Sequence, residues 1–285
     1  MIRYTLMPPQ QQTPIDSSPF HQYIIDNDTV WTDFHRTDGG YLLRFPDLAD
    51  FEVSTDGTEI VALPACGADD ATVEHLYINQ MRPLALSRQG QPTFHASVVT
   101  VSGGVVAFLG KSGMGKSTLA ASFALNDSQF LSDDALQVEE TIKGCNALPG
   151  HASLRLWQDS VEALVNADTV QAAAISYSSK TRLLAGEALA HDAQTQPLLA
   201  AYLLQAESVS DVRMQALTGV NRHMAWVHNS FLLDIEDPDL LERHFDWTHR
   251  IACTVPTFSL DYPRNYGILP AVQNAVRQHA ADSGN

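Results

Sequence analysis

The sequence predicts an α/β fold: a phosphate-loop (P-loop) domain with a mixed sheet and helices, preceded by a small β-rich domain. From about residue 90, strand-like segments alternate with helix-like segments, which is typical of a partly parallel sheet covered by helices. A glycine-rich loop at 110–117 separates a buried apolar strand from a helix. Residues 1 to about 80 contain short strand-like segments and turns instead. We therefore expect a β-rich accessory domain at 1–85 and the P-loop domain at 86–285.

The N-terminal segment carries strand and turn signals but no catalytic pattern. Residues 41–45, 51–54 and 60–63 are strand-like, and Thr55-Asp-Gly-Thr58 is a turn between the last two. Apolar residues at helical spacing predict a helix at 73–86 that Pro83 ends or bends. A domain that recruits a substrate is the use we expect for this segment.

The C-terminal segment begins with two strands, 94–101 and 105–109, joined by the hairpin turn Ser102-Gly103-Gly104. Asp237 followed by Pro238 is a helix start, because the first can cap the helix and the second fits its first turn. The other elements expected here are a helix at 117–125, strands at 129–132, from 138, at 197–204 and at 257–260, and helices at 238–253 and 269–280.

Composition limits the classes of partner. The 285 residues include 33 acidic and 17 basic side chains, a net charge of −16. Such a surface repels nucleic acids and anionic lipids, so we expect neither as a partner. The charge serves solubility, or it forms an acidic face for a basic protein or peptide. The three cysteines are far apart and form no C-x-x-C pair, so no disulfide framework or zinc site is expected. Without a signal peptide or an apolar span, the expected location is cytoplasmic.

The glycine-rich loop Gly110-Lys-Ser-Gly-Met-Gly-Lys-Ser117 matches G-x-x-x-x-G-K-[ST] at every fixed position. Its glycines let successive backbone N–H groups point at a phosphate. Lys116 can then reach the β- and γ-phosphates of ATP, and the Ser117 hydroxyl can bind Mg²⁺. The predicted nucleotide-binding residues are Gly110, Lys111, Ser112, Gly113, Met114, Gly115, Lys116, Ser117 and Thr118.

Paired aspartates, Asp133 and Asp134, follow the short strand at 129–132. A helix of about ten residues runs ~15 Å away from the phosphates, and the next strand returns about as far. A crossover connection therefore brings both carboxylates to the edge of the sheet that carries the phosphate loop. Phosphoryl transfer to a hydroxyl needs a metal ligand and a proton acceptor there, and two aspartates can divide these tasks. The alternative is that either one caps a turn.

Three segments in this order and spacing resemble the bacterial HPr kinase family: Phe94-His-Ala-Ser97, the loop 110–117 and Leu131-Ser-Asp-Asp134. The nucleotide domain of that family is related to phosphoenolpyruvate carboxykinase, so the resemblance implies a mixed sheet of this type. The chain looks closest to HPr-kinase-like proteins of peptide-maturation gene clusters, including lasso-peptide kinases that phosphorylate a serine of a precursor. The similarity is specific over about residues 90–135 and weaker at 148–157 and 255–264.

The resemblance implies a role for each matching residue. Lys116 would hold phosphate, Ser117 and Asp133 would bind Mg²⁺, and Asp134 would be the general base. His95, which as an isolated histidine would be structural more often than functional, would lie beside the phosphates. The family's glutamate signature after the aspartates is absent, and its place is taken by the region of Pro149-Gly150 and Arg155. Because of that departure, the resemblance leaves open whether the chain has a second carboxylate for the metal, whether it catalyses the reverse reaction and whether HPr is its substrate. For Arg155 two roles stay open: contact with the transferred phosphate, or a structural role.

The predicted function is that of an ATP- and Mg²⁺-dependent kinase acting on a serine of a peptide or protein, with a lasso precursor peptide as the favoured acceptor. A small-molecule hydroxyl kinase is one alternative. Another is a regulatory P-loop ATPase without an acceptor, against which stand the missing LSGGQ-like segment and the missing second strand ending in Asp-Glu. The expected partner is the peptide or protein substrate, and a homo-oligomer is left open.

Overall fold

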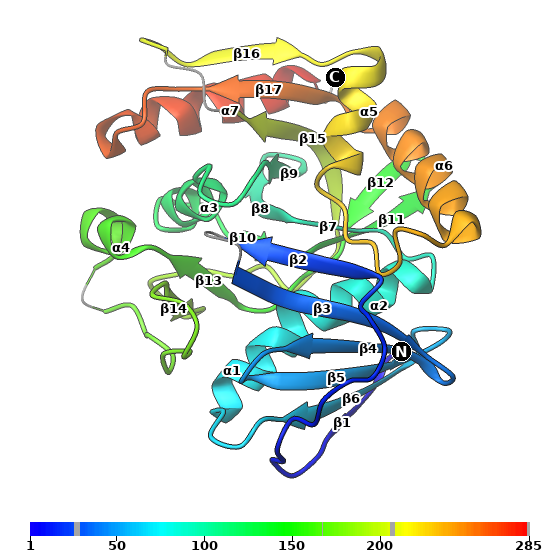
Figure 1. The fold of residues 1–285 in the computed structure, drawn as a ribbon. Helices are drawn as coiled ribbons and strands as arrows, with labels where there is room; N and C mark the ends of the chain where they lie inside the picture. The colour runs from blue at the N-terminus through cyan, green and yellow to red at the C-terminus, as the bar shows by residue number, and fades with distance from the viewer. Residues whose placement is uncertain (26–28, 167, 206–208, 284–285) are drawn as a thin grey trace. The chain divides into compact units, whose positions relative to one another are not determined.

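The computed structural model describes residues 1–25, 29–166, 168–205 and 209–283 (Figure 1). The chain forms two compact units. The first unit contains Met1–Gln91, Ala174–Ser178 and Leu232–Leu241, and the second contains Pro92–Ala173, Ser179–Phe231 and Glu242–Asn285. Ala174–Ser178 and Leu232–Leu241 thus belong to the first unit although they come later in the chain. The two units are therefore not separated by a single boundary in the sequence. The division at residue 85 stays a prediction.

The first unit is built on a six-stranded sheet in the order β1-β6-β5-β4-β3-β2. β1 runs parallel to β6, and the other neighbours are antiparallel. Alternate residues of the central strands, among them Leu43, Phe51 and Ile60, are fully buried on one face. The strands are β1 (Arg3–Leu6), β2 (His21–Ile25), β3 (Thr29–Thr37), β4 (Gly40–Phe45), β5 (Ala49–Ser54) and β6 (Glu59–Pro64).

The sequence predicts that Pro83 ends or bends the helical segment of this unit, and the segment continues past Pro83. Instead of ending a helix, Pro83 lies in the first turn of α2 (Arg82–Arg88), which continues from α1 (Asp70–Leu76) through a π-helical turn at Tyr77–Met81. Proline is tolerated at the start of a helix because the N–H that it lacks has no partner within the helix there. The change of helix type before Pro83 provides such a start.

The second unit contains a mixed sheet in the order β10-β8-β9-β15-β12-β11-β7, with β17 beside β15 and β16 beside β17. β9, β15 and β17 run parallel, and the remaining pairs are antiparallel. The predicted mixed α/β architecture is therefore confirmed. The strands are β7 (Thr93–Phe94), β8 (Ala96–Val101), β9 (Gly104–Leu109), β10 (Phe130–Ser132), β11 (Leu136–Thr141), β12 (Gly144–Ala147), β15 (Gln196–Leu204), β16 (Arg213–Ala216) and β17 (Thr257–Asp261).

Helices cover both faces of this sheet (Figure 1). Val106 and Phe108 of β9 pack in one core with α3 (Lys116–Ala124) and α7 (Leu269–Ser283). The intervening residues, Val105, Ala107 and Leu109, belong to a second core with Trp226 and Ile251. Those two residues lie on α5 (Gly219–Val227) and α6 (Pro238–Thr254). A strand buried on both faces is apolar throughout, as the sequence of β9 is.

A separate two-stranded antiparallel sheet is formed by β13 (Ser153–Leu156) and β14 (Thr181–Leu184), and α4 (Gln158–Leu164) lies in the connection between them. These elements, together with β12, β16 and α5, were not predicted from the sequence. The single strand expected at 94–101 is interrupted at His95, because Phe94 pairs with Leu136 of β11 whereas Ala96 pairs with Leu109 of β9. The change of partner strand leaves His95 between β7, at one edge of the sheet, and β8, which lies next to the opposite edge strand β10.

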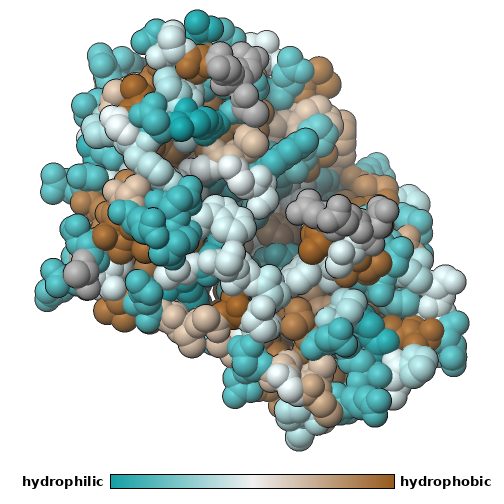
Figure 2. All heavy atoms as spheres, turned by 60° about the vertical axis from the view of Figure 1, so that its left-hand side comes forward, coloured by the Kyte–Doolittle hydropathy of each residue, from teal (hydrophilic) through white to brown (hydrophobic). Residues whose placement is uncertain are grey.

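On the face drawn in Figure 2, hydrophilic side chains predominate and hydrophobic ones are scattered in small groups. Within the described ranges, no helix combines the length and apolar character needed to cross a membrane.

Candidate active site

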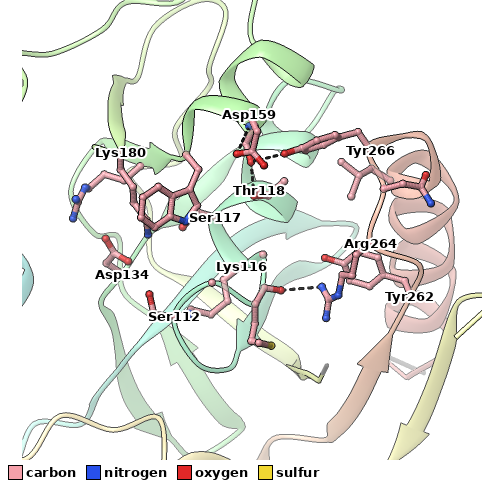
Figure 3. Close-up of a pocket in the computed structure, with 18 of the residues that line it drawn as sticks. Ser112, Lys116, Ser117, Thr118, Asp134, Asp159, Lys180, Tyr262, Arg264 and Tyr266 are labelled. Carbon is pink, nitrogen blue, oxygen red and sulfur yellow. Dashed lines mark hydrogen bonds between the residues drawn. The ribbon is translucent and has the colours of Figure 1, made fainter. Parts of the chain in front are cut away.

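The phosphate loop follows β9 and ends where α3 begins. Gly113 and Gly115 have φ angles of 82° and 89°, a region that side-chain-bearing residues rarely adopt. The Lys116 ammonium lies inside the loop and donates hydrogen bonds to the carbonyl oxygens of Gly110 (2.6 Å) and Lys111 (3.1 Å). Burial lowers the pKa of Lys116 to about 8, although the nearby carboxylates of Asp134 and Asp133 raise it. The loop therefore encloses a buried cation (Figure 3).

Asp133 is buried behind the pocket at the end of β10. One carboxylate oxygen accepts a hydrogen bond from the Ser97 hydroxyl (2.5 Å) and the other accepts one from the Arg155 backbone N–H (3.1 Å). The Ser117 side chain lies close enough to this carboxylate to lower its pKa, against the larger effect of burial. Burial, and then the charge of Asp134, raise the pKa of Asp133 to about 6. The two predicted metal ligands, Ser117 and Asp133, are therefore neighbours.

Asp134 faces the pocket instead. Its backbone is left-handed, with φ of 66°, a conformation that aspartate tolerates better than most residues. Its carbonyl oxygen accepts a hydrogen bond from Nδ1 of His95 (3.1 Å), so the proton of the His95 ring is on that nitrogen. The turn at Asp134 sends two consecutive carboxylates in different directions, Asp133 into the protein and Asp134 into the pocket.

His95 lines the same pocket, and a hydrogen bond of its backbone N–H fixes its position. Its N–H donates to the carbonyl oxygen of Asn229 (2.6 Å), just after α5. Burial and the positive charge of Lys116 lower the pKa of His95 to about 4. The ring is therefore neutral near pH 7, with one nitrogen available as an acceptor.

Asn229 connects His95 to the phosphate loop. Its side-chain oxygen accepts the N–H of Gly110 (2.9 Å), and its amide nitrogen donates to the Ala225 carbonyl oxygen (2.8 Å). Asn229 could not be found from the sequence, because it lies more than 100 positions from the loop and belongs to no motif.

The pocket encloses about 270 Å³ and is formed by the second unit. Of the predicted site residues, His95, Asp134, Arg155 and the loop residues 112–118 line it. Gly110, Lys111 and Asp133 are outside the lining but contact it through the hydrogen bonds above. Residues that the sequence did not single out as lining residues are Trp157, Asp159, Ser160, Lys180, Tyr262, Arg264, Asn265, Tyr266 and Leu269.

Further cations surround the loop. Lys180, directly before β14, has its ammonium 5.2 Å from the centre of the Trp157 ring, and its charge contributes to lowering the pKa of Lys116 and of His95. Arg264 follows β17, lies 4.3 Å over the Tyr262 ring and donates to the Met114 carbonyl oxygen (2.9 Å). No local pattern marks Lys180, whereas Tyr262 and Arg264 lie inside the 255–264 segment of weak family similarity.

The donor set fits a magnesium nucleotide. Within the part of the chain that the structure describes, no group of three or more His, Cys, Asp or Glu could hold a metal ion by itself. Mg²⁺ is usually bound through one or two carboxylates together with substrate phosphates, and it prefers hard oxygen ligands. The Ser117 hydroxyl and the carboxylates of Asp133 and Asp134 are such ligands beside a phosphate loop.

No protein-family model matches this chain, and no curated protein is significantly similar to it. Among solved structures, the HPr(Ser) kinase/phosphatase from Coxiella burnetii is similar at 10% sequence identity with a TM-score of 0.35. The match covers 68% of this chain and 99% of that chain. A likeness of this strength does not establish a shared family.

Proposed function

We propose that this chain is an ATP- and Mg²⁺-dependent kinase that transfers the γ-phosphate to the serine hydroxyl of a peptide or protein. The observation that supports this function is the arrangement at the phosphate loop: Asp133 contacts Ser117, while Asp134 enters the pocket near Lys116. In this proposal, one carboxylate binds the metal ion and the other accepts the proton of the acceptor hydroxyl.

Ser117 and Asp133 would hold Mg²⁺, which supplies charge neutralisation at the phosphates when it is bound. The loop N–H groups and Lys116 bind the phosphates. Lys116 already sits in the loop through its hydrogen bonds to Gly110 and Lys111, so little reorganisation is needed to present its charge. Lys180 and Arg155 add positive charge to the same pocket.

Asp134 is the proposed general base. It accepts the proton of the serine hydroxyl as the serine oxygen forms a bond to the γ-phosphorus and the bond to the β–γ bridging oxygen breaks, which leaves ADP. Asp133 is less accessible to an acceptor hydroxyl because it is buried and does not line the pocket. His95, through its hydrogen bond to the Asp134 carbonyl, fixes the turn that directs Asp134 into the pocket.

A peptide or protein is the proposed acceptor because the first unit offers a surface that a metabolite kinase does not require. Its edge strand β2 exposes Tyr23, Ile24 and Ile25 in succession. An extended peptide can bind such an edge through main-chain hydrogen bonds and side-chain contacts. A precursor peptide of the lasso class is the acceptor that we propose to test first.

The test is incubation with Mg-ATP and a short precursor peptide encoded beside the gene, followed by mass spectrometry. We expect a gain of one phosphate on the peptide, and no gain with Asp134→Asn or with a peptide whose acceptor serine is alanine. Phosphorylation of a small hydroxyl compound but not of the peptide would favour a metabolite kinase. ADP release that needs no acceptor would favour a regulatory ATPase, and either result would contradict the proposal.

A further inference from the structure

A row of hydroxyl groups leads from the phosphate loop into the outer part of the pocket. The Thr118 hydroxyl lies 3.1 Å from the Ser160 hydroxyl, which in turn lies 3.1 Å from the hydroxyl of Tyr266 (Figure 3). These residues come from α3, from α4 and from the 3₁₀ turn before α7. Three separate segments thus build one polar wall beside the loop.

Asp159 adds a carboxylate to this wall. One of its oxygens accepts the Ser160 N–H (2.9 Å). Burial raises the pKa of Tyr266, and the nearby Asp159 carboxylate raises it further. A carboxylate has acceptor sites for about four hydrogen bonds, so these contacts fix its direction without exhausting it. Asp159 lines the pocket and is exposed to it.

Asp159 is remote from the groups proposed for phosphoryl transfer. Figure 3 shows Asp134 and Lys180 on one side of Ser117 and Thr118, and Asp159 with Tyr266 on another. The pocket therefore has a transfer end at Asp134 and a second end at Asp159.

The orientation of a nucleotide in a phosphate loop determines what reaches the second end. The lysine of the motif contacts the β- and γ-phosphates, so the γ-phosphate lies near Lys116 and the α-phosphate lies further along the loop. The pocket continues past Thr118 along the hydroxyl row, which is where the sugar of such a nucleotide would extend. A carboxylate near a triphosphate is unfavourable unless it accepts hydrogen bonds, and the ribose hydroxyls are donors that acidic side chains bind in other nucleotide sites.

We propose that Asp159 binds the ribose 2′- and 3′-hydroxyls of the bound nucleotide, so that the protein selects ribonucleotides over nucleotides that lack these hydroxyls. The inference rests on the proposed function only in requiring that the loop binds a nucleoside triphosphate. It assigns a role to a carboxylate that phosphoryl transfer does not use.

The experiment measures the affinities of Mg-ATP and Mg-2′,3′-dideoxy-ATP by titration calorimetry with the full chain. We expect the parent to bind ATP at least about tenfold more tightly, the magnitude of a hydrogen bond to a charged group. Asp159→Ala should bind both nucleotides within about twofold of each other, with dideoxy-ATP affinity unchanged. The matched control is Glu162→Ala, an exposed carboxylate one turn further along α4 and outside the pocket lining, which should keep the parent's preference.

Equal affinity of the parent for the two nucleotides would overturn the ribose contact while leaving the proposed kinase function standing. The same holds if Asp159→Ala raises the Mg²⁺ concentration needed for binding and keeps the tenfold preference, because Asp159 would then be a metal ligand. If the parent binds no nucleotide, both this inference and the proposed function are wrong.

Discussion

At the scale of single residues, the two adjacent aspartates differ in their surroundings, and we therefore expect them to have different roles. Asp133 is buried, hydrogen-bonded at both oxygens and in contact with Ser117. Asp134 occupies the pocket with its backbone held by His95. A motif of two identical residues thus supports two tasks, because burial and hydrogen bonding decide which carboxylate is available to an acceptor hydroxyl.

Substitution of each aspartate should therefore give a different defect. Asp134→Asn should leave ATP binding nearly intact and lower the transfer rate by ~10²–10⁴-fold, the usual loss for a general base. Asp133→Asn should instead raise the Mg²⁺ concentration required for half-maximal activity. Steady-state kinetics at varied ATP and Mg²⁺ measure both effects. Equal and small losses in the two variants would show that the pair only caps a turn.

Lys116→Ala should abolish nucleotide-dependent activity, because the charge aimed at the β- and γ-phosphates is lost. The thermal midpoint should change little, because the lost bonds to Gly110 and Lys111 are intraloop contacts and a buried charge is removed at the same time. ATP affinity and thermal unfolding are the measurements. Lys143→Ala, an exposed lysine in the turn between β11 and β12, is the control for loss of a positive charge. Full turnover in a folded Lys116→Ala variant would contradict the phosphate-loop assignment.

His95 should make the unfolding free energy sensitive to acid. Its pKa is about 4 in the folded protein, whereas a histidine in an unfolded chain titrates near ~6.5. Between these pH values the unfolded state binds a proton that the folded state does not, so His95 lowers stability as the pH falls through this window. Asp133, with a pKa raised to about 6, acts in the opposite direction and is present in both parent and variant.

Urea unfolding of the parent and of His95→Asn at pH 7.5 and pH 5 isolates the histidine. On going to pH 5 the parent should lose about 1–2 kcal/mol more unfolding free energy than the variant, whose amide can still donate to the Asp134 carbonyl. Parallel losses in the two proteins would show that His95 is not held neutral.

At the scale of elements, the end of α5 fixes two parts of the site at once. Asn229 binds Gly110 through its side chain and His95 through its carbonyl oxygen. Asn229→Ala removes the first contact and frees the start of the phosphate loop. We expect ATP affinity to fall about tenfold, in line with the ~1 kcal/mol of a lost hydrogen bond and the unsatisfied N–H left behind. Calorimetric titration of Mg-ATP measures this.

A matched control lies at the end of α3. The amide of Asn126 donates to the Ser122 carbonyl oxygen (2.8 Å), as Asn229 does to that of Ala225 (2.8 Å), but Asn126 has no contact with the loop. Asn126→Ala should therefore lose the same helix-terminal bond and keep ATP affinity. A similar loss of affinity in both variants would mean that Asn229 acts only through the stability of the fold.

The elements that could be predicted are those whose sequence pattern lies within one continuous segment of the chain. β9, the loop and α3 form one contiguous motif, and β10 with its aspartates follows at a fixed crossover distance, so these positions could be predicted. Asp159, Lys180 and Asn229 could not, because each reaches the pocket through tertiary packing of α4, β14 or α5. The interruption at His95 was also missed, because it depends on a change of partner strand.

At the scale of the whole molecule, positive charge is concentrated where the phosphates would bind. The net charge is −16, yet Lys116, Arg155, Lys180 and Arg264 line one pocket. The acidic remainder of the surface disfavours nonspecific contact with nucleic acids, and the local cations still favour a triphosphate.

The first unit carries the last prediction, which concerns the peptide acceptor. Deletion of residues 1 to about 85 is a poor test, because Ala174–Ser178 and Leu232–Leu241 pack with this unit and Arg36 is paired with Asp234 (2.7 Å). Removing the sheet would expose those segments to solvent. Substitutions on the edge strand β2 leave the unit intact and are the better experiment.

Within the described residues no strand pairs with the outer edge of β2, and Tyr23, Ile24 and Ile25 are 56, 51 and 45% exposed. Replacing all three by serine removes apolar contacts from this edge and keeps its backbone. If the edge binds the peptide, the KM for peptide should rise about tenfold or more, whereas the KM for ATP and kcat stay unchanged. Ile142→Ser, an isoleucine fully exposed in the turn between β11 and β12, controls for loss of a surface apolar side chain. An unchanged peptide KM in the triple variant would contradict a recruiting role for the apolar side chains of Tyr23, Ile24 and Ile25.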